Sequence, residues 1–234
     1  MNKIFNLDNP VMVFLTRVAD LIILNVLAIV CSLPIITIGA SWTAMHYVTI
    51  RMVRKEEGYI ARDFFKSFKE NFKQATVIWL IAMVALFVIV GDYFIFFSDP
   101  ASIPKWIMVV IVILTYLALS TIVFVFPLLA RYKNTTGKMI LNAFLLSVAN
   151  VPHAVTHIVF FALPIVLLIF KPQFLALIAM IGYSGLAYIG SIFWNQIFKK
   201  MEPEAEASSD EEEMNETDEV LVEEIETSAE EAVE

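Results

Sequence analysis

The sequence predicts an all-α protein that crosses a lipid membrane several times, and three observations support this fold class. Of the 234 residues, 59% are apolar and only 17% are charged, whereas an average soluble domain is roughly 45–50% apolar and about 25% charged. Several apolar runs, 75–97 and 106–130 among them, are long enough to cross a hydrocarbon core, which takes roughly 20 helical residues. Basic residues gather between the apolar runs, as expected for short cytoplasmic loops. This composition excludes a disordered chain, a disulfide scaffold and a nucleic-acid-binding domain.

The net charge of −8 conceals two parts of opposite charge. Residues 201–234 hold 16 of the 24 carboxylates and no Lys or Arg, whereas residues 1–200 hold all 16 basic residues. We therefore divide the chain into a membrane domain, 1–200, and an acidic tail, 201–234, which like-charge repulsion predicts to be disordered. The single cysteine, Cys31, excludes an intramolecular disulfide and a zinc site built on several thiolates.

Five or six crossings are predicted, and the number depends on residues 11–50. This stretch is too long for one crossing and slightly short for two, and Leu33-Pro34 and Gly39-Ala40-Ser41 interrupt it. Either it crosses once, or it forms a hairpin that turns near Pro34–Gly39. With six crossings, which we favour, the expected helices are about 10–33, 41–54, 75–97, 106–130, 149–170 and 173–198.

The distribution of basic residues favours the hairpin. Segments 51–74 and 131–148, together with Lys199-Lys200, place twelve Lys and Arg on one side of the membrane. A hairpin adds Lys3 and Arg17 to that side, and a single crossing puts them on the other. Since cytoplasmic loops collect Lys and Arg, we predict six crossings with both termini in the cytoplasm.

Segment 58–73, between the first stretch and the next crossing, has the pattern of an amphipathic helix. Phe64, Phe68 and Phe72 recur at every fourth residue, while the lysines point to other faces; these are Lys66, Lys69 and Lys73. A helix of this kind lies at the membrane surface with its lysines near anionic lipid headgroups. The segment either connects two membrane helices and packs on their cytoplasmic ends, or serves as an element for partner docking or gating.

A family resemblance rests on the first 80 residues. The runs Phe5-Asn6-Leu7-Asp8-Asn9-Pro10 and Leu33-Pro34-Ile35-Ile36-Thr37-Ile38-Gly39-Ala40 resemble the YesL-like family of bacterial integral membrane proteins. So does Glu57-Gly58-Tyr59-Ile60, with the phenylalanine-rich segment that follows it. The resemblance implies a multi-pass protein of the bacterial cell membrane with no assigned activity. Because genes of this family tend to lie beside carbohydrate uptake genes, it also implies a role linked to carbohydrate uptake.

Six polar side chains fall inside apolar segments, where ionisable and polar groups are costly and point to functional hypotheses; they are Arg17, Asp20, Asn25, His46, His153 and His157. Arg17 and Asp20 can pair on one helix face, and Asn25 can hydrogen-bond to a neighbouring helix. The alternative is that these three line a path for a solute.

His153 and His157 have the spacing with which two imidazoles can face one metal ion. The further ligands are missing from the nearby sequence, so we expect no metal site. A polar patch at the interface is favoured, with proton sensing as the alternative.

No catalytic signature occurs in the chain, because the GxxxxGK[ST], GxSxG and HExxH motifs are all absent. We therefore expect no catalytic residue and no cofactor, and predict that the protein is not an enzyme. The favoured function is a non-enzymatic accessory or regulatory component of the plasma membrane, and the alternative is a small solute transporter or channel subunit. The expected partners are the lipid bilayer and other membrane proteins such as a carbohydrate transporter, and nucleic acid is not expected.

The predicted topology can be tested with reporter fusions. A cytoplasmic reporter placed at Asn2, in 55–72, in 133–148 and in the acidic tail should be active at all four positions, because each lies on the side that holds most of the basic residues. An extracellular N-terminus, with the other three positions inside, would show that 11–50 crosses the membrane once.

Overall fold

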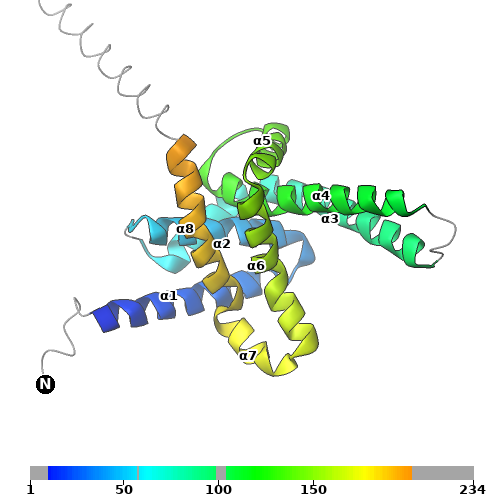
Figure 1. Ribbon diagram of the computed structural model, residues 1–234. Helices are drawn as coiled ribbons and strands as arrows, with labels where there is room; N and C mark the ends of the chain where they lie inside the picture. Colours follow the sequence, from blue (N-terminus) through cyan, green and yellow to red (C-terminus); the bar gives the residue numbers. More distant parts are fainter. Residues whose placement is uncertain (1–9, 57, 99–103, 202–234) are drawn as a thin grey trace, which may run out of the picture. The chain divides into compact units, whose positions relative to one another are not determined.

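The computed structural model describes residues 10–56, 58–98 and 104–201, and over these residues the fold is all-α without a strand. Seven α-helices have 14 or more residues (Figure 1): α1 (Pro10–Cys31), α2 (Ile38–Val53), α3 (Ile60–Ser98), α4 (Lys105–Arg131), α5 (Thr136–Ala149), α6 (Val151–Phe170) and α8 (Tyr183–Met201). Shorter elements stand before α2 and α8: η1 (Ile35–Thr37), η2 (Pro172–Phe174), α7 (Leu175–Leu177) and the π-helix η3 (Ile178–Gly182). The chain forms two compact units, 1–193 and 194–234, and the packing below lies within the first.

Five helices of the described residues are long and apolar enough to cross a membrane. They are Met12–Cys31, Ile60–Ser98, Trp106–Arg131, Val151–Phe170 and Pro172–Lys200. The prediction of an all-α protein with several apolar membrane helices is thereby confirmed. The sixth predicted crossing corresponds to α2, whose 16 residues are fewer than the roughly 20 that a full crossing takes.

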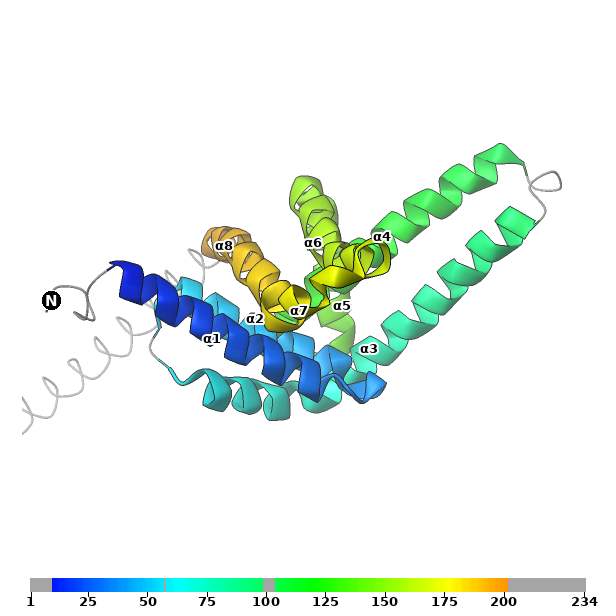
Figure 2. The ribbon, with the colours of Figure 1, turned by 90° about the horizontal axis from the view of Figure 1, so that it is seen from below.

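Helix α2 lies at the centre of the first unit. The chain reverses direction after α1, and α2 runs back beside it (Figures 1 and 2). Eleven of its 16 residues are buried, among them Ala40, Ala44 and Val48. A Cβ atom on Gly39 would lie 2.7 Å from both the carbonyl oxygen of Ala75 and the Cβ of Trp79. Only glycine therefore lets the start of α2 approach α3 so closely.

Helix α3 is longer than the sequence predicted, because the amphipathic segment and the next crossing form one helix of 39 residues. The sequence changes from polar to apolar near Gln74-Ala75, but no proline or glycine stands there to end the helix. The change in hydropathy marks a change of environment along one continuous helix.

The phenylalanines of this segment differ from the predicted interfacial anchors. Phe64 has no exposed surface and belongs to a core cluster with Leu21, Leu24 and Val48 of α1 and α2. Phe68 packs partly against the same cluster, and Phe72 is 36% exposed. The three lysines are exposed: Lys66, Lys69 and Lys73. Phe64 thus packs the segment against α1 and α2, which is what a segment that connects two membrane helices would do. Of the three phenylalanines only Phe72 is exposed.

Helix α5 occupies most of the segment 131–148, which the sequence analysis treated as a basic loop. Its buried residues Met139, Ala143 and Ser147 recur at every fourth position and face α4. The Ser120 hydroxyl of α4 donates a hydrogen bond to the Ser147 hydroxyl at 3.2 Å. At 1.5 Å per residue, 14 residues span about 21 Å, which is too short to cross a membrane.

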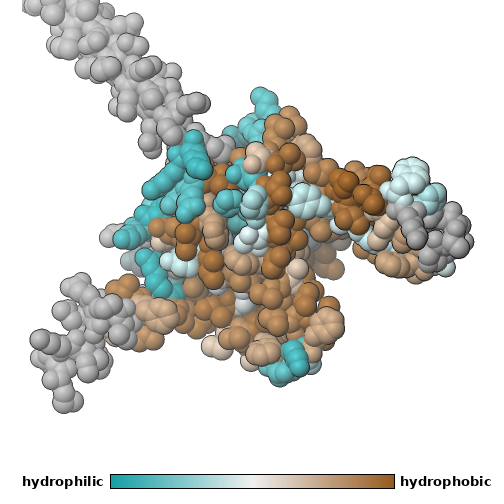
Figure 3. All heavy atoms as spheres, viewed as in Figure 1, coloured by the Kyte–Doolittle hydropathy of each residue, from teal (hydrophilic) through white to brown (hydrophobic). Residues whose placement is uncertain are grey.

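The second half of α3 and the first half of α4 extend away from the other helices as an arm (Figures 1 and 2). Large apolar side chains cover it, with exposed fractions of 81% for Phe87, 74% for Phe94 and 66% for Trp106. In the space-filling view hydrophobic residues dominate its described surface (Figure 3). Such a surface is at home in hydrocarbon and not in water.

The burial of Phe64 leads to a first prediction from the structure. Phe64→Ala should destabilise the protein by about 3 kcal/mol, because a buried ring leaves a cavity. Phe65→Ala is the matched control, since this neighbouring ring is 42% exposed, and it should cost less than about 1 kcal/mol. Thermal unfolding in detergent measures both, and equal losses would show that Phe64 is not a packing residue.

Candidate functional site

The side chain of Asn25 on α1 is fully buried and makes four hydrogen bonds to backbone groups of another segment. Its amide nitrogen donates hydrogen bonds to the carbonyl oxygens of Ile178 at 3.0 Å and Ala179 at 2.8 Å. Its carbonyl oxygen accepts from the backbone N–H groups of Tyr183 at 3.2 Å and Ser184 at 2.9 Å. Asn25 therefore uses both donors and both lone pairs of its amide.

These four bonds fall where the last crossing is irregular. In a regular α-helix the Tyr183 N–H would bond to the Ala179 carbonyl, whereas η3 is a π-helix with wider turns. Asn25 bonds to both of these groups. The Ser184 hydroxyl donates in return to the Leu21 carbonyl of α1 at 2.8 Å. The two helices thus exchange hydrogen bonds in both directions.

A crevice of about 460 Å³ opens beside this junction, lined by residues of α1, α2, α3 and α6 and by Tyr183. Its walls are largely apolar, and its polar groups come from Ser32, Ser41, Trp42, Trp79 and Tyr183. Three of these polar groups are already bonded. Ser41 donates to the Ala28 carbonyl at 2.8 Å, Trp79 donates to the Ile35 carbonyl at 2.8 Å, and Trp42 donates to a ring nitrogen of His46. The crevice has the size and apolar character of a small-ligand pocket.

A smaller cavity of about 30 Å³ brings two histidines together, His46 from α2 and His157 from α6. It shares Trp42 and Tyr183 with the crevice and has room for roughly two water molecules. The sequence had paired His157 with His153, one turn earlier on the same helix. In the structure His153 instead contacts the ring of Phe193, with centroids 5.7 Å apart.

The hydrogen bonds of the two histidines fix much of their chemistry. The Trp42 indole donates to Nε2 of His46 at 2.5 Å, and since an indole N–H can only donate, Nε2 must be unprotonated. Nδ1 of His46 therefore carries the proton, and it has no hydrogen-bond partner among the described residues. Nδ1 of His157 lies 2.8 Å from the backbone carbonyl oxygen of His153. Within the described residues no three His, Cys, Asp or Glu side chains form a group that could hold a metal ion.

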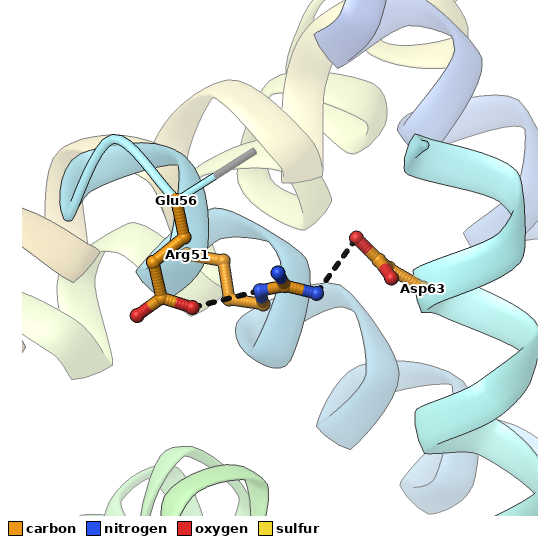
Figure 4. Close-up of polar contacts among 3 residues, drawn as sticks. All are labelled: Arg51, Glu56 and Asp63. Carbon is orange, nitrogen blue, oxygen red and sulfur yellow. Dashed lines mark hydrogen bonds and ion pairs between the residues drawn. The ribbon is translucent and has the colours of Figure 1, made fainter. Parts of the chain in front are cut away.

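An ion-pair network, which the sequence analysis did not find, closes the turn between α2 and α3 (Figure 4). Nε of Arg51 lies 2.8 Å from a carboxylate oxygen of Glu56, and its Nη1 lies 2.9 Å from one of Asp63. Lys55 has a positive φ of 58°, which ends α2 and turns the chain so that the Glu56 N–H donates to the Arg51 carbonyl. A Cβ on Gly58 would lie 2.1 Å from a carboxylate oxygen of Asp63, so a larger residue would displace this carboxylate from its place beside Arg51. In the sequence, the network was marked only by Gly58 in the run Glu57-Gly58-Tyr59, and this run does not indicate an ion pair.

The remaining predicted polar pair does not form. Arg17 and Asp20 are both partly exposed on α1, and no ion pair within 4 Å joins them. Asn25 lies two turns further along the same helix, bonded to η3 and α8. The residues that line the cavity of His46 and His157 do not include Arg17, Asp20 or Asn25.

Comparison with known proteins yields one match. Residues 21–93 match the sequence profile of a family described as protein of unknown function, DUF624. This region contains the second half of α1, all of α2, the Arg51 network and most of α3. No curated protein and no solved structure matches the chain.

The junction at Asn25 can be tested by Asn25→Leu, which keeps the branched shape of the side chain and removes all four hydrogen bonds. Buried backbone groups without partners cost about 1–3 kcal/mol, so the unfolding temperature in detergent should fall. Hydrogen exchange at the amides of Tyr183 and Ser184 should become faster. Thr16→Val is the control, because Thr16 is exposed and bonds only to its own helix. Indistinguishable behaviour of the two variants would mean that the junction does not hold α1 to the last crossing.

Proposed function

Because residues 21–93 form a DUF624 domain, the YesL-like family of membrane proteins, we propose that this protein is a non-enzymatic accessory or regulatory component of the bacterial plasma membrane. The family resemblance supports a link to carbohydrate uptake, with a carbohydrate transporter as the partner. The protein would act by contact with that partner, with no catalytic step of its own.

The observation that carries this proposal is the use of polar side chains inside the helices. Asn25 and Ser184 bond across α1 and α8. The Ser191 hydroxyl donates to the Thr49 hydroxyl at 2.8 Å and so joins α8 to α2. A path for a solute requires polar groups that face an open cavity, whereas these groups bond to neighbouring helices, which favours a packed scaffold.

The arm of α3 and α4 is the surface that we assign to a partner's membrane helices. Its apolar side chains extend beyond the other helices of the unit, so a partner can approach it from several sides within the bilayer. Association between membrane helices depends on close packing, and the small residue Gly91 on α3 has open space around it.

We also propose that both termini are cytoplasmic. In support, Arg51 at the end of α2 and Arg131 at the end of α4 line the same cavity of about 90 Å³. Gln74 of α3 donates a hydrogen bond to the Asn134 carbonyl at 2.8 Å. The two basic segments that the positive-inside rule assigns to the cytoplasm thus lie at the same end of the first unit.

A small solute transporter or channel subunit is the second candidate. The crevice beside Trp42 and Tyr183 favours it, because an inner cavity with His46 and His157 adjoins it. The two candidates differ in a simple property: a transporter moves solute by itself, and an accessory protein does not.

The proposal is tested by photo-crosslinking in native membranes. A photoreactive amino acid at Phe87 or Phe94 on the arm should capture a membrane protein of a carbohydrate uptake system, because these exposed rings would contact it. The same substitution at Phe170 of α6, which is 75% exposed, is the matched control and should capture less.

Liposomes that contain only the purified protein should show no sugar flux above that of empty liposomes. Flux through the protein alone would favour the transporter. Equal capture at Phe94 and Phe170 would contradict the role assigned to the arm.

A further inference from the structure

A groove of about 690 Å³ runs between α3, α4 and α5, and apolar side chains form nearly all of its walls. On α3 it extends from Ile78 to Ala85, and on α4 from Leu114 to Val125. The twelve residues on α4 span about 16 Å at 1.5 Å per residue. This length is close to half of a hydrocarbon core of about 30 Å, and so to the depth of one leaflet.

One end of the groove meets the basic segments. Ile78 lies one turn after Gln74, whose side chain bonds to the loop before α5, and Gly137 lines the groove at the second residue of α5. Exposed basic side chains stand around this end: Lys73, Arg131, Lys133 and Lys138. None of the three lysines forms an ion pair with a carboxylate among the described residues.

The charge along the α3–α4 hairpin is asymmetric. Between residues 71 and 149 the sequence has two carboxylates, Asp92 and Asp99. Asp92 lies on α3 beyond the groove residue Ala85, and Asp99 lies outside the described residues. An apolar channel of one leaflet's depth with a cationic mouth is complementary to a lipid with an anionic headgroup and apolar chains. Contacts between the headgroup and several lysines would add to the affinity that the acyl chains gain from the apolar walls.

We propose that this groove is a binding site for one anionic phospholipid of the cytoplasmic leaflet. Its acyl chain lies along α3 and α4 between Ile78 and Ala85, and its phosphate lies near Lys133 and Lys138. The groove lies at the base of the arm, because part of its lining belongs to the halves of α3 and α4 that form the arm. Its assignment to the cytoplasmic leaflet rests on the topology proposed above, and lipid binding can be measured on the purified protein without a partner.

The apolar half of the site can be tested with a matched pair of glycine substitutions. A Cβ at either Gly137 or Gly91 meets nothing within 4 Å, and both glycines lie in helices. Gly137→Leu adds a side chain at the groove, whereas Gly91→Leu makes the same change outside it. With the full chain in neutral detergent, native mass spectrometry should show phosphatidylglycerol binding reduced about tenfold by G137L and less than about twofold by G91L.

The cationic half is tested by charge removal. The unmodified chain should bind phosphatidylglycerol about tenfold more tightly than phosphatidylcholine, and the double variant Lys133→Gln/Lys138→Gln should lose most of this preference. Lys66→Gln/Lys69→Gln removes the same charge from exposed positions of α3 outside the groove and should retain it. Thermal unfolding without lipid checks that each variant is folded. If G137L does not fold, the comparison of the two lysine double variants tests the proposal by itself.

Three outcomes would overturn the proposal. The first is equal binding of the two lipids by the unmodified chain, and the second is equal effects of the two lysine pairs. The third is a phosphatidylglycerol preference that emerges only after residues 202–234 are deleted, because the acidic tail would then be the occupant of the basic mouth.

Discussion

The Asn25 side chain joins α1 to the irregular start of the last crossing, and the packing of these helices depends on that junction. The wider turn of η3 separates the Tyr183 N–H from the Ala179 carbonyl that it would meet in a regular α-helix, and in hydrocarbon no water can bond to either group. One amide supplies two donors and two acceptor sites to the carbonyls and N–H groups around η3. The irregular turn is therefore tolerated because α1 lies beside it, and α1 is held in register by the same four bonds.

The same constraint explains how the other small polar residues are used. Ser184, Ser191, Thr49 and Ser41 each donate or accept across a helix contact. Within a lipid bilayer the hydrophobic effect does not drive helices together, so close packing and hydrogen bonds must do so. Gly39 contributes to close packing, because without a side chain it allows α2 to contact the backbone of α3. The polar interior is thus largely occupied by structural bonds, and sites open to a ligand or partner lie at the edges of the bundle.

Charge has its effect at the helix ends. Arg51 connects the end of α2 to the start of α3 through two carboxylates, and Asp63 also lies in the first turn of α3, where a negative charge is favourable. This network fixes the angle at which α3 leaves α2 and brings Phe64 against α1 and α2. The cationic end of the α3–α5 groove is built from the neighbouring basic segment, so charges that orient a protein in the membrane can also select the lipid beside it.

The sequence by itself determined the fold class, the presence of several long apolar helices and the family of residues 21–93, because composition and run length are local properties. It favoured six crossings, whereas five of the described helices are long and apolar enough to cross a membrane. It did not predict α5, since its buried face of Met139, Ala143 and Ser147 has meaning only beside α4. The sequence analysis divided α3 into the segments 58–73 and 75–97. The change from polar to apolar residues is visible in the sequence, but it does not show that the helix continues through that change. The junction of Asn25 with residues 178–184, the burial of Phe64 and the meeting of His46 with His157 were decided only by the tertiary structure. Each joins residues on separate helices, and the apolar pattern of a membrane helix does not specify which of its faces meets which neighbour.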